Sequence, residues 1–329
     1  MKARSIKQGI CSVVFGPLMA VVCSFAFAQT TYPTRPITMI VPFPPAGVAD
    51  IVARPIAQAM GRDLGQTVVI ENKAGAGGGI GMAQAARAEP NGYTVLMALS
   101  SIVVVPEADK VLNRPEMYQL SQLKAIARFT ADPTILVVKA DSPWKTYAQF
   151  MAYVGANPAR VSFGSSGNYG SMHIPMEQLK VATGATMLHV PYTGAGPAVT
   201  ALLAGQVDAL STGPSSVVQQ IQAGKLRALA HWGTGRLAVL PDVPSLTELG
   251  VPITYAQWAG LFVPAQVPQP IVDRLRAAAR FAATDPATVR ALTAAGTEIQ
   301  YLDGADFDQY VKTESADMQK LVQIIGKVE

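Results

Sequence analysis

The sequence predicts an α/β protein made of two α/β units with a ligand cleft between them. Short apolar runs rich in β-branched residues alternate with helix-like segments between residues 36 and 97, and the alternation returns between residues 133 and 230. Buried strands that alternate with helices are typical of a parallel sheet covered on both faces. A third observation is the change to helical patterning from residue 270 to the end.

The first part of this pattern predicts three strands and two helices. The strands are expected at residues 36–42, 67–71 and 93–97, and the helices at residues 50–64 and 80–88. One face of the longer helix is apolar, and its residues are Ile51, Val52, Ile56, Ala59 and Met60. Apolar residues at this spacing indicate a helix that packs on a sheet.

The second part predicts four more strands with helices between them. The strands are expected at residues 161–163, 187–190, 207–210 and 226–230, and the helices at residues 172–183, 197–204 and 215–222. Helices are then expected from Pro270, from Asp285 and over the stretch that begins near Phe307. Asp285-Pro286 is an N-cap followed by proline in the first turn, and Gly296 is a stop signal for that helix.

This order of elements fits two α/β units, between which the chain passes more than once, better than one large sheet. We expect residues 29–130 and 254–329 to form the first domain and residues 131–253 to form the second. The crossing strands are expected near residues 126–138 and 254–263. Ligands of open α/β sheets bind beyond the carboxyl ends of the strands, which places a site in the cleft between the domains.

The N-terminus predicts a signal peptide at residues 1–28. Lys2, Arg4 and Lys7 precede an apolar stretch that ends in Ala26-Phe27-Ala28, a small-x-small cleavage pattern. The apolar stretch is short for a membrane anchor, and Val22 is bulky for the residue before a lipid-bearing Cys23. We therefore expect cleavage after Ala28 and a periplasmic protein.

Cleavage there removes both cysteines of the chain, Cys11 and Cys23. It also removes three of the 26 basic residues, which leaves 23 against 22 acidic ones. Without a basic cluster, the sequence does not favour a nucleic-acid partner. Three widely spaced histidines do not match a metal site, so we expect neither a metal nor a cofactor.

Three loops that follow predicted strands are the candidate binding elements. They consist of residues 42–50, 163–173 and 190–198, and they are rich in glycine, serine, proline and alanine. Such loops let a ligand approach backbone N–H groups, and the helix that follows adds partial positive charge. Asp50 is interpreted as the cap of its helix rather than as a ligand contact. Neither these loops nor the glycine-rich residues 74–81 contain lysine or arginine, so we expect no direct cationic clamp.

The sequence offers no catalytic residue that we would assign. The glycine-rich segment 74–81 does not satisfy G-x-G-x-x-G and is not followed by G-K-[ST], so we interpret it as a tight turn that permits close helix packing. Ser165 or Ser166 could pair with His173, but G-x-S-x-G is absent. His173 is interpreted as a hydrogen-bonded packing residue.

With these motifs in this order, the chain resembles the Bug-type periplasmic receptors, the solute-binding components of tripartite tricarboxylate transporters. The resemblance covers nearly all of the chain after the signal peptide. It is carried by residues 42–50, 72–81, 165–173, 205–208, 223–230, 240–244 and 258–264.

The resemblance implies a type II periplasmic binding fold of the Venus-flytrap kind, with a small carboxylate held between the domains. On one side it implies a ligand contact with the loop formed by Ala46, Gly47, Val48, Ala49 and Asp50. On the other side the implied contacts are Ser165, Ser166, Gly167, Asn168, Tyr192, Thr193 and Gly194.

Three positions depart from the family pattern within these loops. Ala46 replaces a usual glycine, and Ala49 replaces a hydroxyl-bearing residue. Tyr169 stands where a small residue is usual, and a tyrosine facing the cleft would favour a smaller or an aromatic acid. We include Tyr169 among the predicted ligand-binding residues for this reason.

The function predicted from the sequence is that of an extracytoplasmic, non-enzymatic receptor. It captures a mono- or dicarboxylate, or an aromatic acid, for the membrane subunits of a tripartite tricarboxylate-type transporter, and we expect it to be a monomer. One alternative is a sensory adaptor that docks on the ectodomain of a sensor kinase. Another is an α/β enzyme that binds a phosphate-bearing cofactor through its glycine loops.

N-terminal sequencing of the exported protein by mass spectrometry tests the signal-peptide prediction. We expect the first residue to be at or near Gln29, because signal peptidase cuts after a small-x-small sequence such as Ala26-Phe27-Ala28. A protein that keeps Met1, or one that carries a lipid on Cys23, would show the prediction to be wrong.

Overall fold

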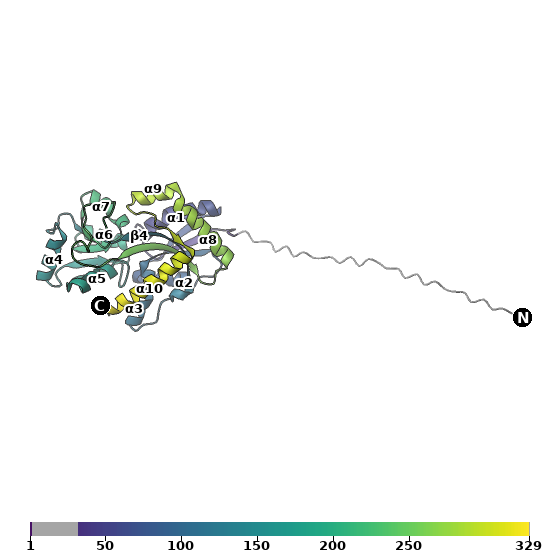
Figure 1. The fold of residues 1–329 in the computed structure, drawn as a ribbon, viewed down its shortest axis with the longest axis horizontal. Coiled ribbons are helices and arrows are strands. Elements are labelled where there is room, and N and C mark those ends of the chain that lie inside the picture. The colour runs from purple at the N-terminus through teal and green to yellow at the C-terminus, as the bar shows by residue number, and fades with distance from the viewer. Residues whose placement is uncertain (2–31, 329) are drawn as a thin grey trace. The chain divides into compact units, whose positions relative to one another are not determined.

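The computed structural model describes Met1 and residues 32–328 (Figure 1). The predicted signal peptide and its cleavage after Ala28 lie outside the described part of the chain. From Tyr32 onward the chain forms one compact unit that contains two β-sheets. We call the six-stranded sheet with its helices lobe 1, and the five-stranded sheet with its helices lobe 2.

The sheet of lobe 1 has the strand order β11-β4-β10-β3-β1-β2. Its strands are β1 (Ile37–Val41), β2 (Val68–Asn72), β3 (Thr94–Leu99), β4 (Leu123–Pro133), β10 (Ala256–Pro264) and β11 (Leu302–Asp303). β1 is parallel to β2 and β3, whereas β10 is antiparallel to both β3 and β4. β11 adds a short antiparallel edge strand next to β4.

The sheet of lobe 2 has the strand order β7-β6-β8-β5-β9. Its strands are β5 (Ile135–Lys139), β6 (Ser162–Ser165), β7 (Leu188–Pro191), β8 (Ala209–Thr212) and β9 (Leu226–His231). β6 is parallel to β7 and β8, and β5 is antiparallel to β8 and β9.

The parallel pairing that the sequence predicts is confirmed within the βα units of both lobes, and each sheet also contains antiparallel strands. Two of the antiparallel strands, β5 and β10, are those that receive the chain from the other lobe. β4 passes directly into β5 through Thr134 alone, and β10 follows a connection that returns from β9. A strand that arrives from the other lobe has no crossover helix to turn it, so it enters its sheet against the direction of the βα units.

The helices match the sequence prediction in most places. They are α1 (Val48–Leu64), α2 (Gly79–Ala86), α3 (Val105–Val111), α4 (Tyr147–Ala156), α5 (Ile174–Thr183), α6 (Ala195–Leu203), α7 (Val218–Gln222), α8 (Gln269–Thr284), α9 (Pro286–Ala294) and α10 (Gly304–Ile325). Figure 1 shows α4 to α7 around lobe 2 and the other helices around lobe 1. The predicted cap of α9 is confirmed, because the Asp285 side chain accepts the Thr288 N–H.

Two helices were missing from the prediction. α3 is a short helix of seven residues, with Val and Pro at its start. α4 begins after Thr146, whose hydroxyl accepts the Gln149 N–H, while the Gln149 amide oxygen accepts the Lys145 N–H. This Thr-x-x-Gln spacing is a helix-start signal that the sequence analysis overlooked.

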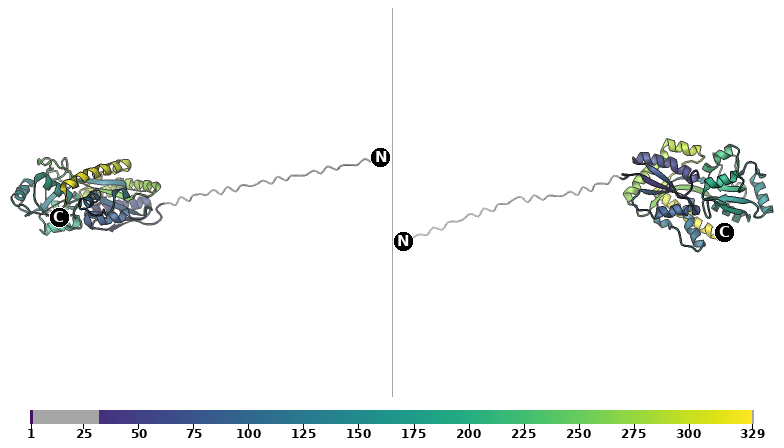
Figure 2. Two further views of the ribbon diagram at one scale, coloured as in Figure 1. Left: turned by 90° about the horizontal axis from the view of Figure 1, so that it is seen from below. Right: turned by 180° about the vertical axis from the view of Figure 1, so that it is seen from behind.

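The last helix links the lobes through the chain end. α10 packs on β4 and α3 of lobe 1, with Phe307 against the Trp258 ring of β10 at a centroid distance of 5.8 Å. Figure 2 shows α10 over lobe 1 and the C-terminus beside lobe 2.

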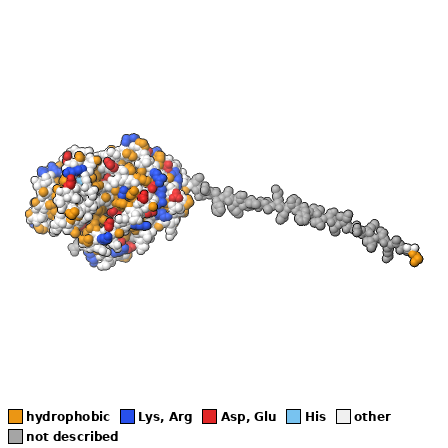
Figure 3. Space-filling model, in the orientation of Figure 1, with side chains coloured by type: hydrophobic (Ala, Val, Ile, Leu, Met, Phe, Trp, Pro, Cys, Tyr) orange, Lys and Arg blue, Asp and Glu red, His pale blue; other side chains and the backbone are white. Residues whose placement is uncertain are grey.

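On the face of the molecule seen in Figure 3, basic and acidic side chains are interspersed.

A buried carboxyl lies where β4 leaves lobe 1. Asp132 is 8% exposed and bonds with the hydroxyl of Thr297, which follows α9. Burial raises the pKa of Asp132 from 3.8 to about 6. An acid with a raised folded-state pKa favours the protonated folded form, so it costs stability as the pH rises through this window.

Asp132→Asn should therefore stabilise the protein relative to wild type by an amount that grows between pH 4 and pH 7. A shift of this size corresponds to about 3 kcal/mol at most. Urea unfolding of both proteins at several pH values measures the difference. Asp242→Asn, which removes an exposed carboxylate, is the control. An Asp132→Asn effect that does not change with pH would contradict the assignment.

Candidate ligand-binding cleft

A cavity of about 560 Å³ opens between loops of the two lobes. Its wall on lobe 1 comes from the segment after β2, from α3 and from the segment after α3, and its wall on lobe 2 comes from the loops after β6 and β7. The lining residues are Ala76, Val105, Ala108, Arg114, Gly167, Asn168, Tyr169, Pro191, Tyr192, Thr193 and Pro197.

The loop after β6 supplies three predicted site residues to this cavity, namely Gly167, Asn168 and Tyr169. Ser165 and Ser166 are also predicted site residues, but both are buried and neither is part of the cavity wall. Their hydroxyls bond to the loop itself, since Ser165 Oγ accepts the Gly167 N–H at 3.0 Å. These two serines thus fix the loop instead of lining the cavity.

The loop after β7 supplies Tyr192 and Thr193 to the cavity wall. Tyr192 is half-buried and Thr193 is exposed. Gly194 is buried behind them, where a Cβ would lie 2.4 Å from the Cδ of Pro44. α6 begins at the next residue, Ala195. A small residue at position 194 therefore lets the loop before α1 pack against the start of α6.

The loop before α1 lies behind the cavity. Among the described residues, none of Ala46, Gly47, Val48, Ala49 and Asp50 is part of the cavity wall. A Cβ on Gly47 would be 3.6 Å from the Cβ of Ala195. The direct ligand contact of this loop stays a prediction, and what the structure shows is its packing on lobe 2.

The interpretation of Asp50 as a helix cap was wrong. α1 starts at Val48 with Gly47 as its N-cap, so Asp50 lies in the first turn. Its carboxylate accepts the Ala46 N–H at 3.0 Å and two hydrogen bonds of 2.8 Å from Arg54. Burial acts to raise the pKa of Asp50, but hydrogen bonds from Arg54, Ala46 and Asn72 outweigh it and lower the pKa below 3.8. The charged carboxylate holds the loop closed on itself.

The glycine-rich segment does more than permit helix packing. A Cβ on Gly81 would lie 2.8 Å from the Lys73 carbonyl oxygen, which agrees with the tight turn that we expected. Gly77, however, faces lobe 2, since a Cβ there would be 3.0 Å from the Asn168 carbonyl oxygen. A Cβ on Gly167 would in turn be 2.9 Å from the Gly77 nitrogen. The backbones of the two lobes touch at these glycines.

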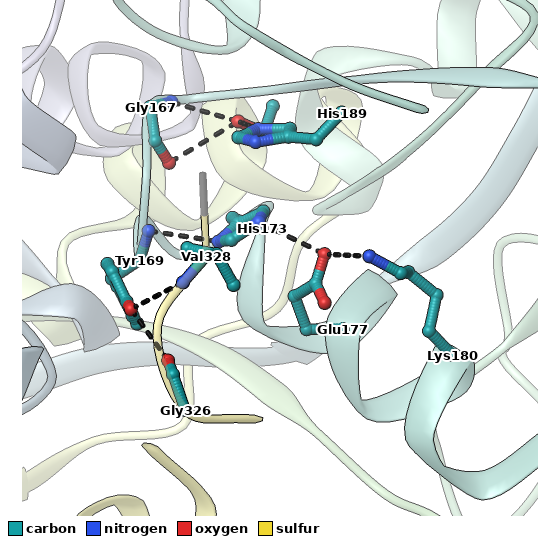
Figure 4. Close-up of polar contacts among 9 residues, drawn as sticks. Gly167, Tyr169, His173, Glu177, Lys180, His189, Gly326 and Val328 are labelled. Atoms are coloured by element: carbon teal, nitrogen blue, oxygen red, sulfur yellow. Dashed lines mark hydrogen bonds and ion pairs between the residues drawn. The ribbon is translucent and has the colours of Figure 1, made fainter. Parts of the chain in front are cut away.

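Two stacked histidines lie behind the loop after β6 (Figure 4). The rings of His173 and His189 are 4.0 Å apart. His173 Nδ1 accepts the Tyr169 N–H at 3.0 Å, which places its proton on Nε2, 3.2 Å from Glu177 Oε1. Ser165 Oγ is 2.6 Å from His189 Nε2. Burial first, and then the charge of His173, lower the pKa of His189 to about 3.

This serine–histidine pair differs from the one weighed in the sequence, which joined Ser165 or Ser166 to His173. The structure pairs Ser165 with His189. Among the described residues, His189 Nδ1 has no hydrogen-bond partner, so a third group that would orient the ring as in a catalytic triad is missing. Ser165 is also 0% exposed, and a substrate in the cavity would not reach it.

Tyr169 connects the cavity wall to the C-terminal tail. Its hydroxyl donates to the Gly326 carbonyl oxygen at 2.8 Å and accepts the Val328 N–H at 3.1 Å (Figure 4). The residue is 1% exposed and has a φ of 56°, which is unusual for a bulky side chain. Its polar group is thus occupied by the chain end that follows α10.

Several neighbours of the cleft were not identified from the sequence. Arg114, Val105 and Ala108 lie in or just after α3, which the prediction lacked. Gln257 of β10 donates to Ser171 Oγ at 2.6 Å and accepts the Gly213 N–H at 2.9 Å, and so joins lobe 1 to lobe 2. A buried glutamine within an apolar strand was the available signal for this contact.

In the part of the chain that the structure describes, no three His, Cys, Asp or Glu side chains gather as a metal site would require. No helix among the described residues has the length and apolar character needed to cross a membrane.

Comparison with known proteins identifies the family. Residues 52–327 match the family model described as the tripartite tricarboxylate transporter family receptor. The chain belongs to this family. Receptors of this family are periplasmic binding proteins, and the resemblance stated from the sequence is confirmed.

Individual members of the receptor family are similar over most of the chain. A UPF0065 protein of Pseudomonas sp. (strain P51) is 35% identical, with 94% of this chain and 93% of that protein covered. The structure of the periplasmic binding protein BugD has a TM-score of 0.85 at 31% identity, covering 90% of this chain and 99% of that chain. MatC from Rhodopseudomonas palustris with bound malate has a TM-score of 0.82 at 29% identity, covering 88% and 100%. The predicted type II periplasmic binding fold is thereby confirmed.

Tyr169→Phe should lower the free energy of unfolding by about 1–2 kcal/mol, because two hydrogen bonds to the tail are lost. A chain that ends at Ile325 should lose a similar amount, and combining the two changes should cost no more than either alone. Urea unfolding measures all three. Tyr153→Phe, at an exposed side chain, is the control. Additive losses would show that Tyr169 and the tail act separately.

Proposed function

We propose that this protein captures a small carboxylate in the cavity between its lobes and delivers it to the membrane subunits of a tripartite tricarboxylate-type transporter. The observation that carries the proposal is the cavity itself, bordered by backbone-rich loops of both lobes in a chain of this receptor family. A structural neighbour at 29% identity holds malate. Binding without chemistry fits a cavity whose wall excludes the serine–histidine pair, since Ser165 is fully buried behind it.

The carboxylate would rest on lobe 2, against the loops that carry Gly167, Asn168 and Thr193. Backbone N–H groups and the Thr193 hydroxyl are the donors that these loops offer to an anion. Ser165, Ser166 and Asp50 would contribute by fixing the loops, as their hydrogen bonds already do. Tyr192 would cover the ligand with its ring from the side of β7.

The proposal includes export and a partner. Cleavage after Ala28 would release the chain into the periplasm, where it would act as a monomer. The closed form would present one surface made of both lobes to the membrane subunits. A sensor-kinase ectodomain would recognise the same closed form, so copurification with either partner in the presence of ligand separates transport from sensing.

A thermal-shift screen of mono- and dicarboxylates tests the binding role. A ligand that binds only the folded state adds about 2.7 kcal/mol at a hundredfold excess over Kd, which raises the melting temperature by several degrees. NAD and ATP serve as the controls for the enzyme alternative. A shift with a nucleotide and none with any carboxylate would refute the receptor function.

Gly167→Ala should abolish or strongly weaken carboxylate binding. Gly167 has a φ of 107°, and a Cβ there would lie 2.9 Å from the Gly77 nitrogen, so the change strains the loop and separates the lobes. Gly155→Ala is the matched control, because Gly155 lies in α4 without a positive φ and a Cβ there meets nothing within 4 Å. Calorimetry with the best ligand of the screen measures both. Equal binding by both variants would contradict the role of the glycine contact.

A further inference from the structure

One wall of the cavity carries a single charged group among otherwise apolar neighbours. On lobe 1 the lining consists of Ala76, Val105, Ala108 and Arg114, and Arg114 is the one charged residue in the whole described lining. It lies outside the loops for which the sequence predicted no cationic clamp, so that prediction does not apply to Arg114.

The guanidinium of Arg114 is held in place by a buried carboxylate. Arg114 Nε donates to Asp109 Oδ1 at 2.5 Å, and the other oxygen of Asp109 accepts the Met117 N–H at 2.9 Å. The Arg114 N–H also donates to the Asp109 carbonyl oxygen at 3.0 Å. The side chain of Asp109 is 0% exposed, whereas that of Arg114 is 48% exposed. The anchor is thus inside the protein and the charged head is at the cavity.

This arrangement leaves one edge of the guanidinium open. Nε is used by Asp109, and among the described residues no acceptor bonds to the two Nη groups of Arg114. A planar fork of N–H donors matches a carboxylate with two parallel hydrogen bonds. Since Asp109 fixes the orientation in advance, little conformational entropy is lost when an anion arrives.

Among the described lining residues, no second cationic side chain is available for this role. The hydroxyl of Tyr169 is occupied by Gly326 and Val328, and burial raises the pKa of its phenol, so it stays neutral. A ligand that fills the cavity removes water from the Nη groups of Arg114. A ligand with an apolar far end would leave these donors unpaired, which costs binding energy, and a ligand with an anionic far end would satisfy them.

We propose that Arg114 selects ligands with a second anionic group, so that the preferred solute is a dicarboxylate whose far carboxylate pairs with its Nη groups. This assignment rests on the proposed function, in which the first carboxylate is held by the loops of Gly167 and Thr193. The two ends of the ligand then lie on different lobes. Arg114 is a specificity-determining residue, and it does not take part in binding the first carboxylate.

The test compares linear dicarboxylates from succinate to suberate with the monoamide of each acid, which has the same length and one charge fewer. Calorimetry on the wild-type protein should show tighter binding of the best diacid than of its monoamide, by roughly ten- to a hundredfold. Higher salt should reduce this preference, because Arg114 is half exposed. Equal affinity of wild type for diacid and monoamide would overturn the proposal.

Arg114→Gln should remove the preference by weakening the diacid while the affinity for the monoamide stays within about twofold. Arg114→Lys, which keeps the charge and loses the fork, should show an intermediate loss. Arg160→Gln, at an exposed residue away from the cavity wall, should bind both ligands like wild type. Unfolding midpoints of each variant show that it is folded.

The possible failures are distinguishable. If Arg114→Gln weakens binding of the diacid and of the monoamide equally, the residue supports the shape of the cavity and does not recognise the second carboxylate. The proposal is then wrong. If wild type binds neither acids nor monoamides of any length, the receptor function itself fails, and the role of Arg114 falls with it. If wild type prefers monocarboxylates, the receptor function stands and the dicarboxylate assignment is overturned.

Discussion

The cleft depends on a contact between two backbones that only glycine permits. Gly77 of lobe 1 and Gly167 of lobe 2 approach so closely that a Cβ on Gly167 would be 2.9 Å from the Gly77 nitrogen. Both residues have positive φ, at 64° and 107°. A side chain at either position would hold the lobes apart by its own width. The two walls of the neighbouring cavity would then lie further apart.

The loop that carries Gly167 is supported from behind by a cluster of polar side chains that includes Ser165, His173 and His189. Ser165 bonds to the Gly167 N–H and to His189, and His173 receives the Tyr169 N–H and faces Glu177. Two stacked imidazoles 4.0 Å apart cannot both be positively charged at low cost, and the pKa of His189 near 3 keeps that ring neutral. The loop therefore presents its backbone in one conformation. Both histidines serve this support, and neither is part of the cavity wall.

The sequence was sufficient for the elements whose signals are local. Alternation of apolar runs located the strands, and Asp285 with Pro286 located the start of α9 because capping involves residues three apart. It was insufficient where geometry depends on distant segments. The antiparallel direction of β10, the pairing of Ser165 with His189 and the bond from Tyr169 to Val328 join residues that no local pattern relates. Arg114 was missed for the same reason, since α3 brings it to a cavity whose other wall lies more than fifty residues further along the chain.

Under the proposed function, the positions of the hydrogen-bond donors on the two lobes link ligand selectivity to closure of the cleft. Lobe 2 offers neutral backbone and hydroxyl donors from loops held rigid by buried partners, and lobe 1 offers one oriented guanidinium at a half-exposed side chain. A ligand shifts a conformational equilibrium only by its difference in affinity for the two states. With the proposed role of Arg114, an acid that reaches only the loops of lobe 2 would bind the open and closed forms with similar strength. An acid that spans from those loops to Arg114 would make both contacts only when the lobes are together, so the length and second charge of the ligand would decide how firmly the cleft closes.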